Sequence, residues 1–395
     1  MTGRLQEILV VETAGHGGLL HYAVQLADGL AASVPSVELL ATRGHEFAHH
    51  RGPARPVLVL PTLVPSTRLP SSRWRHLLRR AGIAVRMCGA WARILVEVVR
   101  RRPDVVVTTM DSSHPPAAIG IIAMTLLPGG PRVVHVCHNA VPFNTGHGGL
   151  FRLGRSTRVL LGTVLRRADL VLVHGQRTAD EFREVWGDGP RLAVVPHGDE
   201  RLLAGEPVAP AAEHRVLFFG DWRKIKGLPV LMEAFDRLLE RCPEARLTIA
   251  GSPAPADFDA DLVRRWAAGH GHRVTVWDDY VPDAEVPRVL ASARVVVTPY
   301  LVGFQSGVVH LAMTKGLPVV ASAVGDLPTV VRDGETGRVV PPDDPEKLAD
   351  ALEDVLVPAG RAEAMGRAGL AEMRERHDWR VVGAAVRDAI YRASS

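Results

Sequence analysis

The stretch RVVVTPYLVGFQSGVVHLAMTKGLPVVAS, Arg294–Ser322, decides how the second half of the chain folds. Arg294–Thr298 is a β-branched run of strand length, and Ser306–Lys315 has helical apolar spacing behind a serine N-cap. Pro318–Ala321 is a second buried strand, so the three parts predict one βαβ unit. Its loop, Tyr300–Gln305, lies at the carboxyl end of a parallel strand, where open α/β sheets bind ligands. Backbone N–H groups at the start of the helix would favour a phosphate there, although any α/β domain has such turns.

The segments that follow this stretch resemble a known family. A helix ending in Lys-Gly is followed by LPVVAS, VGDLP, DGETG and VVPPDDPEKLADAL. This order is similar to the carboxyl-terminal half of the retaining glycosyltransferases of group 1, family four, which have the type-B two-domain fold. Single residues also fall where that family places them, namely Gly316, Pro318, Gly325, Pro328, Asp333, Gly334, Gly337 and Pro341.

The chain departs from the family at three acidic positions. The paired glutamates would fall on Gly303 and Leu311, and a third glutamate on Thr329. The chain resembles instead a subgroup that reads Gln-Ser-Gly-Val before the helix. Because an amide can both donate and accept hydrogen bonds, Gln305 and Ser306 are expected to recognise donor hydroxyls in place of the missing carboxylates. The resemblance implies a donor-binding loop made of Gly303, Phe304, Gln305, Ser306 and Gly307.

Length and strand recurrence predict two domains. A chain of 395 residues is too long for one hydrophobic core and suits two domains of about 200 residues each. Strand-like runs alternate with helical stretches in each half, which indicates doubly wound parallel sheets. The expected fold is α/β, with two Rossmann-like domains facing each other across a cleft. The resemblance implies an acceptor-binding domain at 1–198, completed by a C-terminal helix at 379–395, and a nucleotide-sugar-binding domain at 199–378.

Glycines follow the first expected strand, Leu5–Val11, and allow a tight turn into a helix. Their spacing lacks the full dinucleotide fingerprint, so the turn alone is a weak cofactor signal. Family members use a Gly-Gly loop here near the donor diphosphate, and the resemblance therefore implies a donor-binding role for Gly17 and Gly18. A tight turn without a ligand is the alternative.

The segment GDWRKIKG, Gly220–Gly227, carries basic residues before a helix. The subgroup spacing implies that Arg223 and Lys226 lie beside the diphosphate, where they would neutralise the charge of the leaving group. Both are therefore catalytic candidates. The commoner family pattern has an arginine directly after the first glycine, where this chain has Asp221, and a basic surface turn is the alternative.

The segment HVCHNAVPF, His135–Phe143, resembles the His-Asn-x-x-Pro loop of the subgroup. Both histidines are candidates, but only His138 stands at the carboxyl end of the expected strand, facing the cleft. Its imidazole would hydrogen-bond the transferred sugar or the acceptor, which makes it the third catalytic candidate; a structural histidine is the alternative. Further acceptor-side candidates are His114, Asn139 and His147.

Charge is uneven along the chain. Residues 1–190 carry 22 basic and 13 acidic side chains, whereas residues 191–395 carry 25 and 30. A helical segment at 71–102 concentrates the excess, and arginines recur in it every seven positions, at Arg79, Arg86, Arg93 and Arg100. A basic front half could meet anionic lipid, nucleic acid or a phosphorylated substrate. Nucleic acid is the least favoured, because no recognised binding module accompanies the charge.

Two interpretations of the helix at 71–102 stay open. One is peripheral contact with an anionic membrane, with Trp74 or Trp91 at the interface. The other is a solvated arginine face on a core helix. The residues that mark the opposite face are Trp74, Leu77, Leu78, Ala81, Val85, Cys88, Leu95 and Val99.

The resemblance implies transfer of a sugar from a nucleotide diphosphate sugar to an acceptor hydroxyl, with retention of anomeric configuration. It implies no metal and no cofactor beyond that co-substrate, in line with the lack of an Asp-x-Asp at the expected diphosphate site. The acceptor stays open between a small molecule, a glycan and a lipid-linked species. The missing glutamates leave two alternatives: a non-catalytic nucleotide-sugar-binding subunit of a partner enzyme, and a nucleotide-sugar epimerase on the same fold.

Cysteine usage and hydropathy indicate where in the cell the protein is expected. Cys88, Cys137 and Cys242 are scattered without metal or redox spacing, which predicts buried thiols in a reduced compartment. No charged-then-apolar leader opens the chain, and apolar runs such as Ala117–Leu127 are too short to span a bilayer. The expectation is a cytoplasmic protein, at most peripheral on the inner membrane face.

Overall fold

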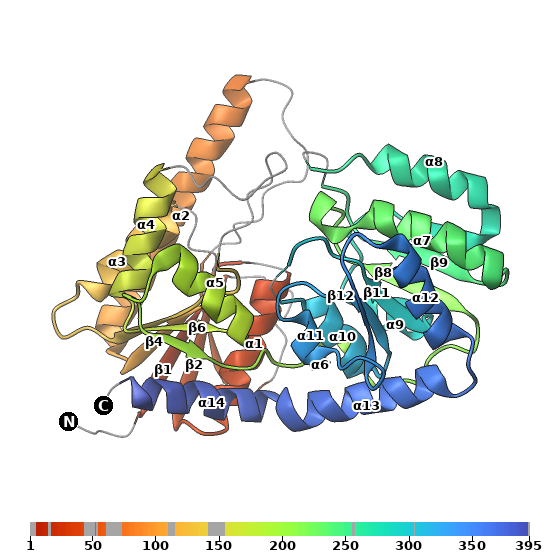
Figure 1. Ribbon diagram of the computed structural model, residues 1–395. Coiled ribbons are helices and arrows are strands. Elements are labelled where there is room, and N and C mark those ends of the chain that lie inside the picture. The colour runs from red at the N-terminus through yellow and green to blue at the C-terminus, as the bar shows by residue number, and fades with distance from the viewer. Residues whose placement is uncertain are drawn as a thin grey trace. The chain divides into compact units, whose positions relative to one another are not determined.

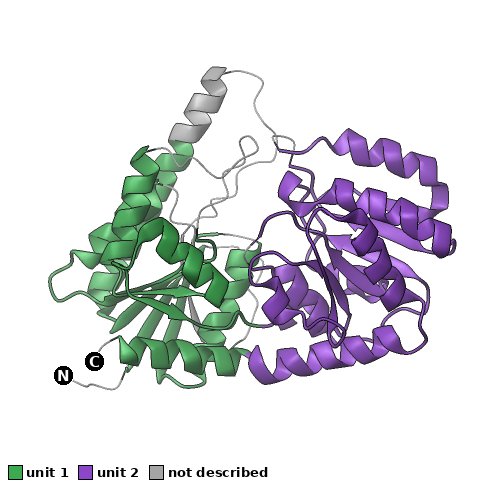
Figure 2. Ribbon diagram, viewed as in Figure 1, with its two compact units in different colours: residues 1–144, 150–198, 379–395 green, residues 145–149, 199–378 purple. Residues whose placement is uncertain are grey.

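A computed structural model describes residues 5–14, 17–42, 52, 54–60, 73–109, 115–140, 155–254, 257–303 and 305–393, with the backbone alone for 55–60 and 73–81. Three candidates named above, Phe304, His114 and His147, lie outside the described residues. The described residues form two compact units (Figure 2). One unit consists of those up to Gly198 together with the segment that begins at Trp379, and the other consists of 199–378.

The first unit is built on a parallel seven-stranded sheet with the order β3-β2-β1-β4-β5-β6-β7 (Figure 1). The strands are β1 (Glu7–Val11), β2 (Ser36–Thr42), β3 (Arg55–Leu60), β4 (Val105–Thr108), β5 (Arg132–Val136), β6 (Leu170–Val173) and β7 (Leu192–Val194). The helices are α1 (Gly18–Ala31), α2 (Arg73–Arg101), α3 (Pro115–Thr125), α4 (Arg155–Arg167), α5 (Gln176–Trp186) and α14 (Trp379–Arg392). The β4 strand, VVVT, is buried at every position, as a parallel strand covered on both faces must be.

The second unit repeats this plan with a parallel six-stranded sheet in the order β10-β9-β8-β11-β12-β13. The strands are β8 (Arg215–Phe219), β9 (Arg246–Ala250), β10 (Val274–Trp277), β11 (Val295–Thr298), β12 (Val319–Ser322) and β13 (Gly337–Val340). The helices are α6 (Arg201–Ala204), α7 (Leu228–Arg241), α8 (Ala260–His270), α9 (Val286–Ala291), α10 (Gly307–Lys315), α11 (Leu327–Val330), α12 (Pro345–Leu356) and α13 (Arg361–Arg376), with short 3-10 turns η1 (Lys224–Lys226) and η2 (Gly271–Arg273).

In both sheets the strand order reverses at one point, between β1 and β4 in the first unit and between β8 and β11 in the second. The strands of each pair are parallel, so the loops that follow them leave from the same edge of the sheet. Ligands of open α/β sheets bind outside the carboxyl ends of the strands at such a switch point. The predicted α/β fold, with a doubly wound parallel sheet in each half, is confirmed.

The C-terminal helix α14 packs against α1 of the first unit through two glycines. A Cβ atom added to Gly29 of α1 would lie 2.0 Å from the carbonyl oxygen of Trp379. A Cβ atom added to Gly383 of α14 would lie 2.3 Å from the carbonyl carbon of Gly29. The helices approach this closely only because neither carries a side chain at the crossing.

The long helix α2 buries a different face from the one predicted. The buried residues are Ala90, Trp91, Ile94 and Val98. The ring of Trp91 occupies the space that a side chain at Gly120 of α3 would need, so Trp91 is a core residue and cannot anchor the helix at an interface. Cys88, predicted as a buried thiol, is exposed. The prediction was wrong because apolar side chains occur all around this helix, and their spacing alone does not say which of them meet α3.

The exposed face of α2 combines charged and apolar side chains. These residues, here called the α2 stripe, are Val85, Arg86, Arg93, Val96, Val99 and Arg100. Val85 is 71% exposed and Val96 is 62% exposed. The side chain of Trp74 is outside the described residues. Among the helices of the described chain, none has the length and hydropathy needed to cross a bilayer.

Replacing Gly29 by alanine tests the crossing of α1 and α14. The added methyl group would collide with the backbone of Trp379, so the helices must separate, and we expect a loss of about 1–3 kcal/mol of unfolding free energy. Gly89→Ala on α2 is the matched control, because its Cβ atom would meet nothing within 4 Å. There alanine is expected to stabilise the helix by up to about 1 kcal/mol. Urea denaturation measures both, and equal stabilities would contradict the close contact.

Candidate functional site

The loop after β8 holds the predicted basic residues in a fixed turn. Trp222 is fully buried, and its backbone N–H donates to the carbonyl of Ser252 at 2.9 Å, which ties the loop to the segment after β9. The backbone N–H of Lys226 donates to the carbonyl of Arg223, also at 2.9 Å, and closes η1. Both basic side chains are half-buried. Arg223 and Lys226 are therefore presented from an ordered turn.

Each of these two cations has a partner close by. The Nε atom of Arg223 lies 2.5 Å from the carboxylate of Asp221. The Nζ atom of Lys226 lies 3.8 Å from the centroid of the Tyr300 ring, in a cation–π contact. Asp221 stands where the commoner family pattern has an arginine, and it reduces the net charge of the loop. The contact between Tyr300 and Lys226 was not predicted, because no spacing rule relates the two positions.

The loops after β8 and β11 are in direct contact. The backbone N–H of Leu301 donates to the carbonyl of Ile225 at 2.8 Å. Gly227, which precedes α7, has a φ of 67°, and an added Cβ atom would lie 1.8 Å from the carbonyl oxygen of Pro299. Only glycine meets both requirements. The structure thus brings the predicted cations and the predicted donor-binding loop together.

Ser306 occupies the predicted N-cap position of α10, but its hydroxyl has another partner. The Ser306 oxygen lies 3.2 Å from the hydroxyl oxygen of Tyr300 and makes no capping bond to the helix. Gly307 is the exposed first residue of α10, and Gln305 is half-buried before it. Tyr300 therefore contacts both the residue that begins α10 and the Lys226 ammonium group.

The three positions where the family has glutamates differ in how much space and burial surround them. A Cβ atom at Gly303 would meet only ordinary contacts, the nearest being 3.6 Å from the Tyr300 ring, so a side chain would fit there. Leu311 is 2% exposed within an apolar cluster of the second unit. Thr329 is exposed on α11. A carboxylate at position 311 would be buried among apolar side chains, which is costly, so leucine suits this core.

A carboxylate from another segment lies at the start of α10. Glu200 is 5% exposed, and its Oε1 atom is 3.3 Å from the position that a Cβ atom of Gly307 would take. The backbone N–H of Glu200 donates to the hydroxyl of Thr314 at 3.2 Å, which holds the residue against α10. Sequence reasoning missed Glu200, because the VVPHGDE turn shows an acid but not the helix that it will meet.

In the first unit, the glycine turn lies at the switch point. Gly17 has a φ of 84° and its carbonyl accepts backbone hydrogen bonds from Leu20 and His21 at 3.0 and 3.2 Å, so it begins α1. A Cβ atom at Gly17 or Gly18 would meet nothing within 4 Å. The backbone conformation therefore requires glycine at position 17, and the described residues leave space beside both glycines.

Glu12 joins the two strands of this switch point. Its buried carboxylate accepts a hydrogen bond from the backbone N–H of Thr13 and another from the hydroxyl of Thr109, both at 2.7 Å. A buried carboxylate is tolerated only where such bonds satisfy it. Glu12 was not singled out from the sequence, and the available signal was an acid directly after an apolar strand.

His138 lies two residues beyond β5 in a cluster of rings. Its ring centroid is 4.7 Å from that of Tyr22 in an edge-to-face arrangement and 5.3 Å from that of His174. The backbone carbonyl of Thr109 accepts a hydrogen bond from the imidazole. The Nε2 atom is enclosed and has no hydrogen-bond partner among the described residues. This nitrogen has hydrogen-bonding capacity that the described part of the first unit does not use.

The environment keeps the His138 ring neutral. Burial, followed by the nearby His197 and His135, lowers the pKa of His138 to about 3. A neutral imidazole carries one N–H donor and one acceptor nitrogen. Because the Thr109 carbonyl takes the N–H, Nε2 is the acceptor. Burial also raises the pKa of Tyr22 above its ordinary value, so that ring is uncharged as well.

The remaining candidates of this segment have structural contacts. His135 is buried within β5, and its Nδ1 atom lies 2.8 Å from the hydroxyl oxygen of Thr108. Asn139 is half-buried, and its backbone carbonyl accepts a hydrogen bond from the Cys137 thiol at 3.0 Å. The described candidates therefore fall into two sets. One set lies at the β8–β11 switch point, and the other lies around His138 and the glycine turn.

Two family profiles match the chain, one in each unit. Residues 17–198 match the profile described as "Glycosyl transferase 4-like domain". Residues 213–357 match the profile described as "Glycosyl transferases group 1". The second match contains the loops after β8 and β11 that hold the predicted donor residues.

Named relatives are similar over part of their length. The D-inositol 3-phosphate glycosyltransferase of Corynebacterium diphtheriae is 30% identical over 60% of each chain. The phosphatidyl-myo-inositol mannosyltransferase of Mycolicibacterium smegmatis is 35% identical over 49% of this chain and 48% of the relative. A GDP-mannose-dependent alpha-(1-6)-phosphatidylinositol monomannoside mannosyltransferase of the same organism is 28% identical over 73% of this chain and 76% of the relative. The first two matches thus span less than two thirds of those relatives.

Solved structures share the fold over nearly the whole chain. Sucrose-phosphate synthase from Thermosynechococcus elongatus superposes with a TM-score of 0.72 at 20% identity, covering 99% of this chain and 100% of that one. HepE of Anabaena, solved in complex with UDP and glucose, has a TM-score of 0.70 at 16% identity, covering 98% and 99%. At these identities the likeness concerns the fold. The profile matches separately identify residues 17–198 and residues 213–357 as glycosyltransferase domains, the second of them of group 1.

Proposed function

We propose that the chain transfers a hexosyl group from a nucleoside diphosphate sugar to a hydroxyl of an inositol phosphate, either free or in a lipid headgroup. The transfer would retain the anomeric configuration and need no metal ion. The observation that carries the donor half is the contact between the loops after β8 and β11, which gathers Arg223, Lys226 and the start of α10. The acceptor half rests on the inositol acceptors in the names of the relatives.

The donor diphosphate would lie between the two basic side chains and the first turn of α10. The guanidinium of Arg223 can hold two phosphate oxygens and the ammonium of Lys226 a third. These interactions strengthen as the bond to the sugar breaks and negative charge moves onto the leaving diphosphate. The start of α10 adds a partial positive charge. Such groups supply the charge neutralisation that a divalent ion supplies in other transferases, which supports a metal-independent reaction.

Asp221 would prepare Arg223 for the donor. The ion pair at 2.5 Å keeps the guanidinium within the loop before the diphosphate arrives. A diphosphate carries more charge than one carboxylate, and it can share or replace Asp221 as the partner of Arg223. The cost of ordering the arginine side chain is then met before binding, which favours affinity.

Retention is accounted for by attack from the side on which the diphosphate leaves. The acceptor oxygen forms the new bond to the anomeric carbon as the bond to the diphosphate oxygen breaks. The acceptor hydroxyl proton passes to that diphosphate oxygen, so no side-chain base is required. His138, whose pKa is about 3, would stay neutral and accept a hydrogen bond at Nε2 from a hydroxyl of the sugar or the acceptor.

Glu200 would help to recognise donor hydroxyls in place of the missing glutamates. Its carboxylate lies beside Gly307, at the start of the helix that the donor would approach. A carboxylate accepts stronger hydrogen bonds from hydroxyls than a neutral amide does. Gln305 is the second candidate for this task, while the Ser306 hydroxyl is already bonded to Tyr300.

The α2 stripe suits an acceptor that is part of a membrane. Arginines and exposed valines occur together on this face, and such a mixed basic and apolar surface suits a helix that lies on an anionic bilayer. Each arginine near such a surface contributes about 1 kcal/mol. The stripe therefore favours the lipid-linked form of the acceptor over the free inositol phosphate, with contact at the membrane face only.

Turnover with paired donors and acceptors tests the proposed function. The chain is given GDP-mannose or UDP-glucose in the presence of EDTA, with either D-inositol 3-phosphate in solution or phosphatidylinositol in vesicles. We expect acceptor-dependent release of the nucleoside diphosphate with one of these pairs. Reversing two charges of the stripe, Arg86→Glu with Arg93→Glu, should slow the vesicle reaction at least about tenfold. The rate with a soluble acceptor should not change.

Three results of this experiment would contradict the proposal or a part of it. Donor binding without acceptor-dependent release in any pair would favour the non-catalytic subunit. Activity that disappears in EDTA while the chain stays folded, and returns on adding Mg²⁺ or Mn²⁺, would refute metal independence. If the charge reversals slow the reactions with soluble and vesicle acceptors equally, the proposed membrane contact is refuted, but the proposed transferase activity is not.

Lys226 and its neighbour Lys224 provide a matched pair for the donor site. Lys226→Met should weaken binding of GDP or UDP by about 1–3 kcal/mol, since a charge-assisted contact to phosphate is lost. Lys224→Met, at an exposed position of the same turn, should leave the affinity unchanged. Isothermal titration measures both. In the same series, Glu200→Gln should weaken the binding of the nucleotide sugar more than the binding of the nucleoside diphosphate. If all variants bind both ligands with the affinity of the parent, this donor site is excluded.

His138→Phe tests the neutral imidazole. The folded protein holds His138 with a pKa of about 3, whereas an unfolded histidine has a pKa of about 6.5. Between these values unfolding takes up a proton, so stability falls as pH falls below about 6.5, by up to about 1.4 kcal/mol per pH unit from this residue. The variant removes that proton uptake. Its stability should therefore decline less steeply than that of the parent between pH 7 and pH 5.

Exposed His272 supplies the control for this measurement. His272→Phe makes the same replacement at an exposed position, and its urea midpoints are measured at each pH beside those of His138→Phe and the parent. Phenylalanine keeps the ring contact with Tyr22 but lacks the acceptor nitrogen, so kcat of His138→Phe should fall about 10–100-fold at normal nucleotide affinity. Parallel pH profiles for His138→Phe and the parent would disprove the buried neutral state, and an unchanged kcat would disprove the role in transfer.

A further inference from the structure

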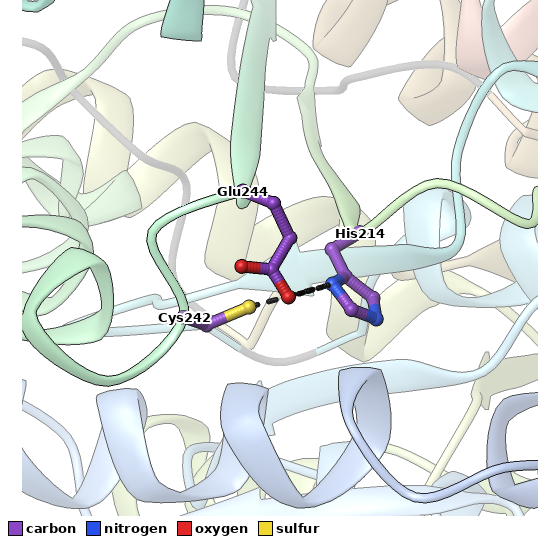
Figure 3. Close-up of side chains that lie close together, drawn as sticks. All are labelled: His214, Cys242 and Glu244. Carbon is purple, nitrogen blue, oxygen red and sulfur yellow. Dashed lines mark hydrogen bonds and ion pairs between the residues drawn. The ribbon is translucent and has the colours of Figure 1, made fainter.

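Three side chains of different chemistry lie close together in the second unit (Figure 3). They lie near the amino ends of β8 and β9, whereas the loop of Arg223 and Lys226 follows the carboxyl end of β8. His214 directly precedes β8, Cys242 follows α7, and Glu244 lies in the turn before β9. One imidazole nitrogen, the thiol sulfur and one carboxylate oxygen all lie within 4.8 Å of one another. The Nδ1 atom of His214 is 3.0 Å from Glu244 and 3.5 Å from the Cys242 sulfur.

Backbone hydrogen bonds fix the positions of these residues. The N–H of Arg246 donates to the carbonyl of His214 at 2.9 Å, which joins the starts of β8 and β9. The N–H of Cys242 donates to Leu238 at 2.7 Å, and the N–H of Ala245 donates to Cys242 at 3.0 Å, so the turn between α7 and β9 is closed. The cluster is therefore held by three regular elements and not by a free loop.

The separations match those within a tetrahedral metal site. Zinc binds a histidine nitrogen at about 2.0–2.1 Å, a carboxylate oxygen at about 2.0–2.2 Å and a thiolate at about 2.3 Å. Tetrahedral angles then place neighbouring ligand atoms about 3.3–3.6 Å apart. The nitrogen–sulfur distance of 3.5 Å lies in that range, and the nitrogen–oxygen distance of 3.0 Å is slightly shorter. Small rotations of the exposed Glu244 side chain would complete the fit.

The donor set also selects the kind of ion. Sulfur with imidazole nitrogen and one carboxylate suits zinc and its chemical relatives, whereas calcium and magnesium prefer oxygen alone. Cys242 is buried, while the side chains of His214 and Glu244 are 23% and 63% exposed, so an ion can enter from the Glu244 side. Three protein ligands leave the fourth position of a tetrahedron to water.

We propose that His214, Cys242 and Glu244 form a binding site for a zinc-class divalent ion that fastens the end of α7 to the starts of β8 and β9. The five residues of β8 separate this site from the loop of Arg223 and Lys226, a distance of about 16 Å along the strand. The ion would be structural, and the proposed sugar transfer does not require it. The spacing of the three cysteines did not indicate this site.

Cobalt(II) is the probe, because it occupies zinc sites and its bond to a thiolate absorbs in the near ultraviolet. The full chain, free of any polyhistidine tag, is titrated with CoCl₂, and Zn²⁺ is then added. We expect a charge-transfer band that saturates at one equivalent, intense visible bands of tetrahedral cobalt, and loss of both on adding Zn²⁺. Cys242→Ser should abolish the charge-transfer band.

Cys242 is buried, so Cys242→Ser can unfold the chain. Variants of the more exposed ligands test the proposal in that case. His214→Gln and Glu244→Gln should each weaken cobalt affinity about tenfold or more, as losing a ligand costs at least as much as losing a group that supports one. Cys88→Ser and His272→Gln, at exposed positions outside the cluster, should bind cobalt like the parent. Absence of the band in the parent, or its persistence in Cys242→Ser, would overturn the proposal.

Discussion

The pairing of β8 with β11 is the contact on which the second unit depends. These strands are far apart in the sequence, yet Val216 lies beside Val295 and Leu217 beside Val296 in parallel register, all fully buried. The strands β9 and β10 extend the sheet on one side of this pair, and β12 and β13 extend it on the other. Because the pair is parallel, a loop rich in cations and a loop that begins a helix leave the sheet side by side. The chemistry proposed for the unit follows from that adjacency.

Local sequence signals predicted the loops but not their contacts. Glycines and basic residues at the spacing of the resembled subgroup marked Gly220–Gly227 as a ligand turn, and the β-branched run before Tyr300 marked a strand end. The cation–π contact between Lys226 and Tyr300 was not predictable, because it depends on which strands become neighbours. The same limit applies to Glu200, whose meeting with α10 joins two segments with no shared spacing.

Buried polar groups and helix faces show the same limit: local sequence predicts the element, but not the partners that it will contact. The carboxylate of Glu12 is satisfied by Thr109, which lies 97 positions away, and no local rule selects such a partner. The sequence placed His138 at the carboxyl end of the expected strand, and it lies two residues beyond β5, yet its neutral state comes from burial among rings of other elements. In α2, hydrophobic spacing alone indicated the wrong face, and the gap at Gly120 decided which residues pack. Hydrophobic periodicity therefore predicts helices and strands, whereas the residues that they pack against depend on the shapes of the neighbouring elements.

The position of α14 sets the order in which the protein can be completed during synthesis. The strands of the first unit leave the ribosome before the second unit, but α14, the helix that covers Gly29 of α1, follows the whole second unit in the sequence. Residues 199–378 can fold in the interval, as domains commonly do while a chain is still growing. The unit begun first is thus the last to close. A premature stop or a proteolytic cut just before Trp379 would leave α1 uncovered and the second unit whole, so a break after the second unit would affect the first.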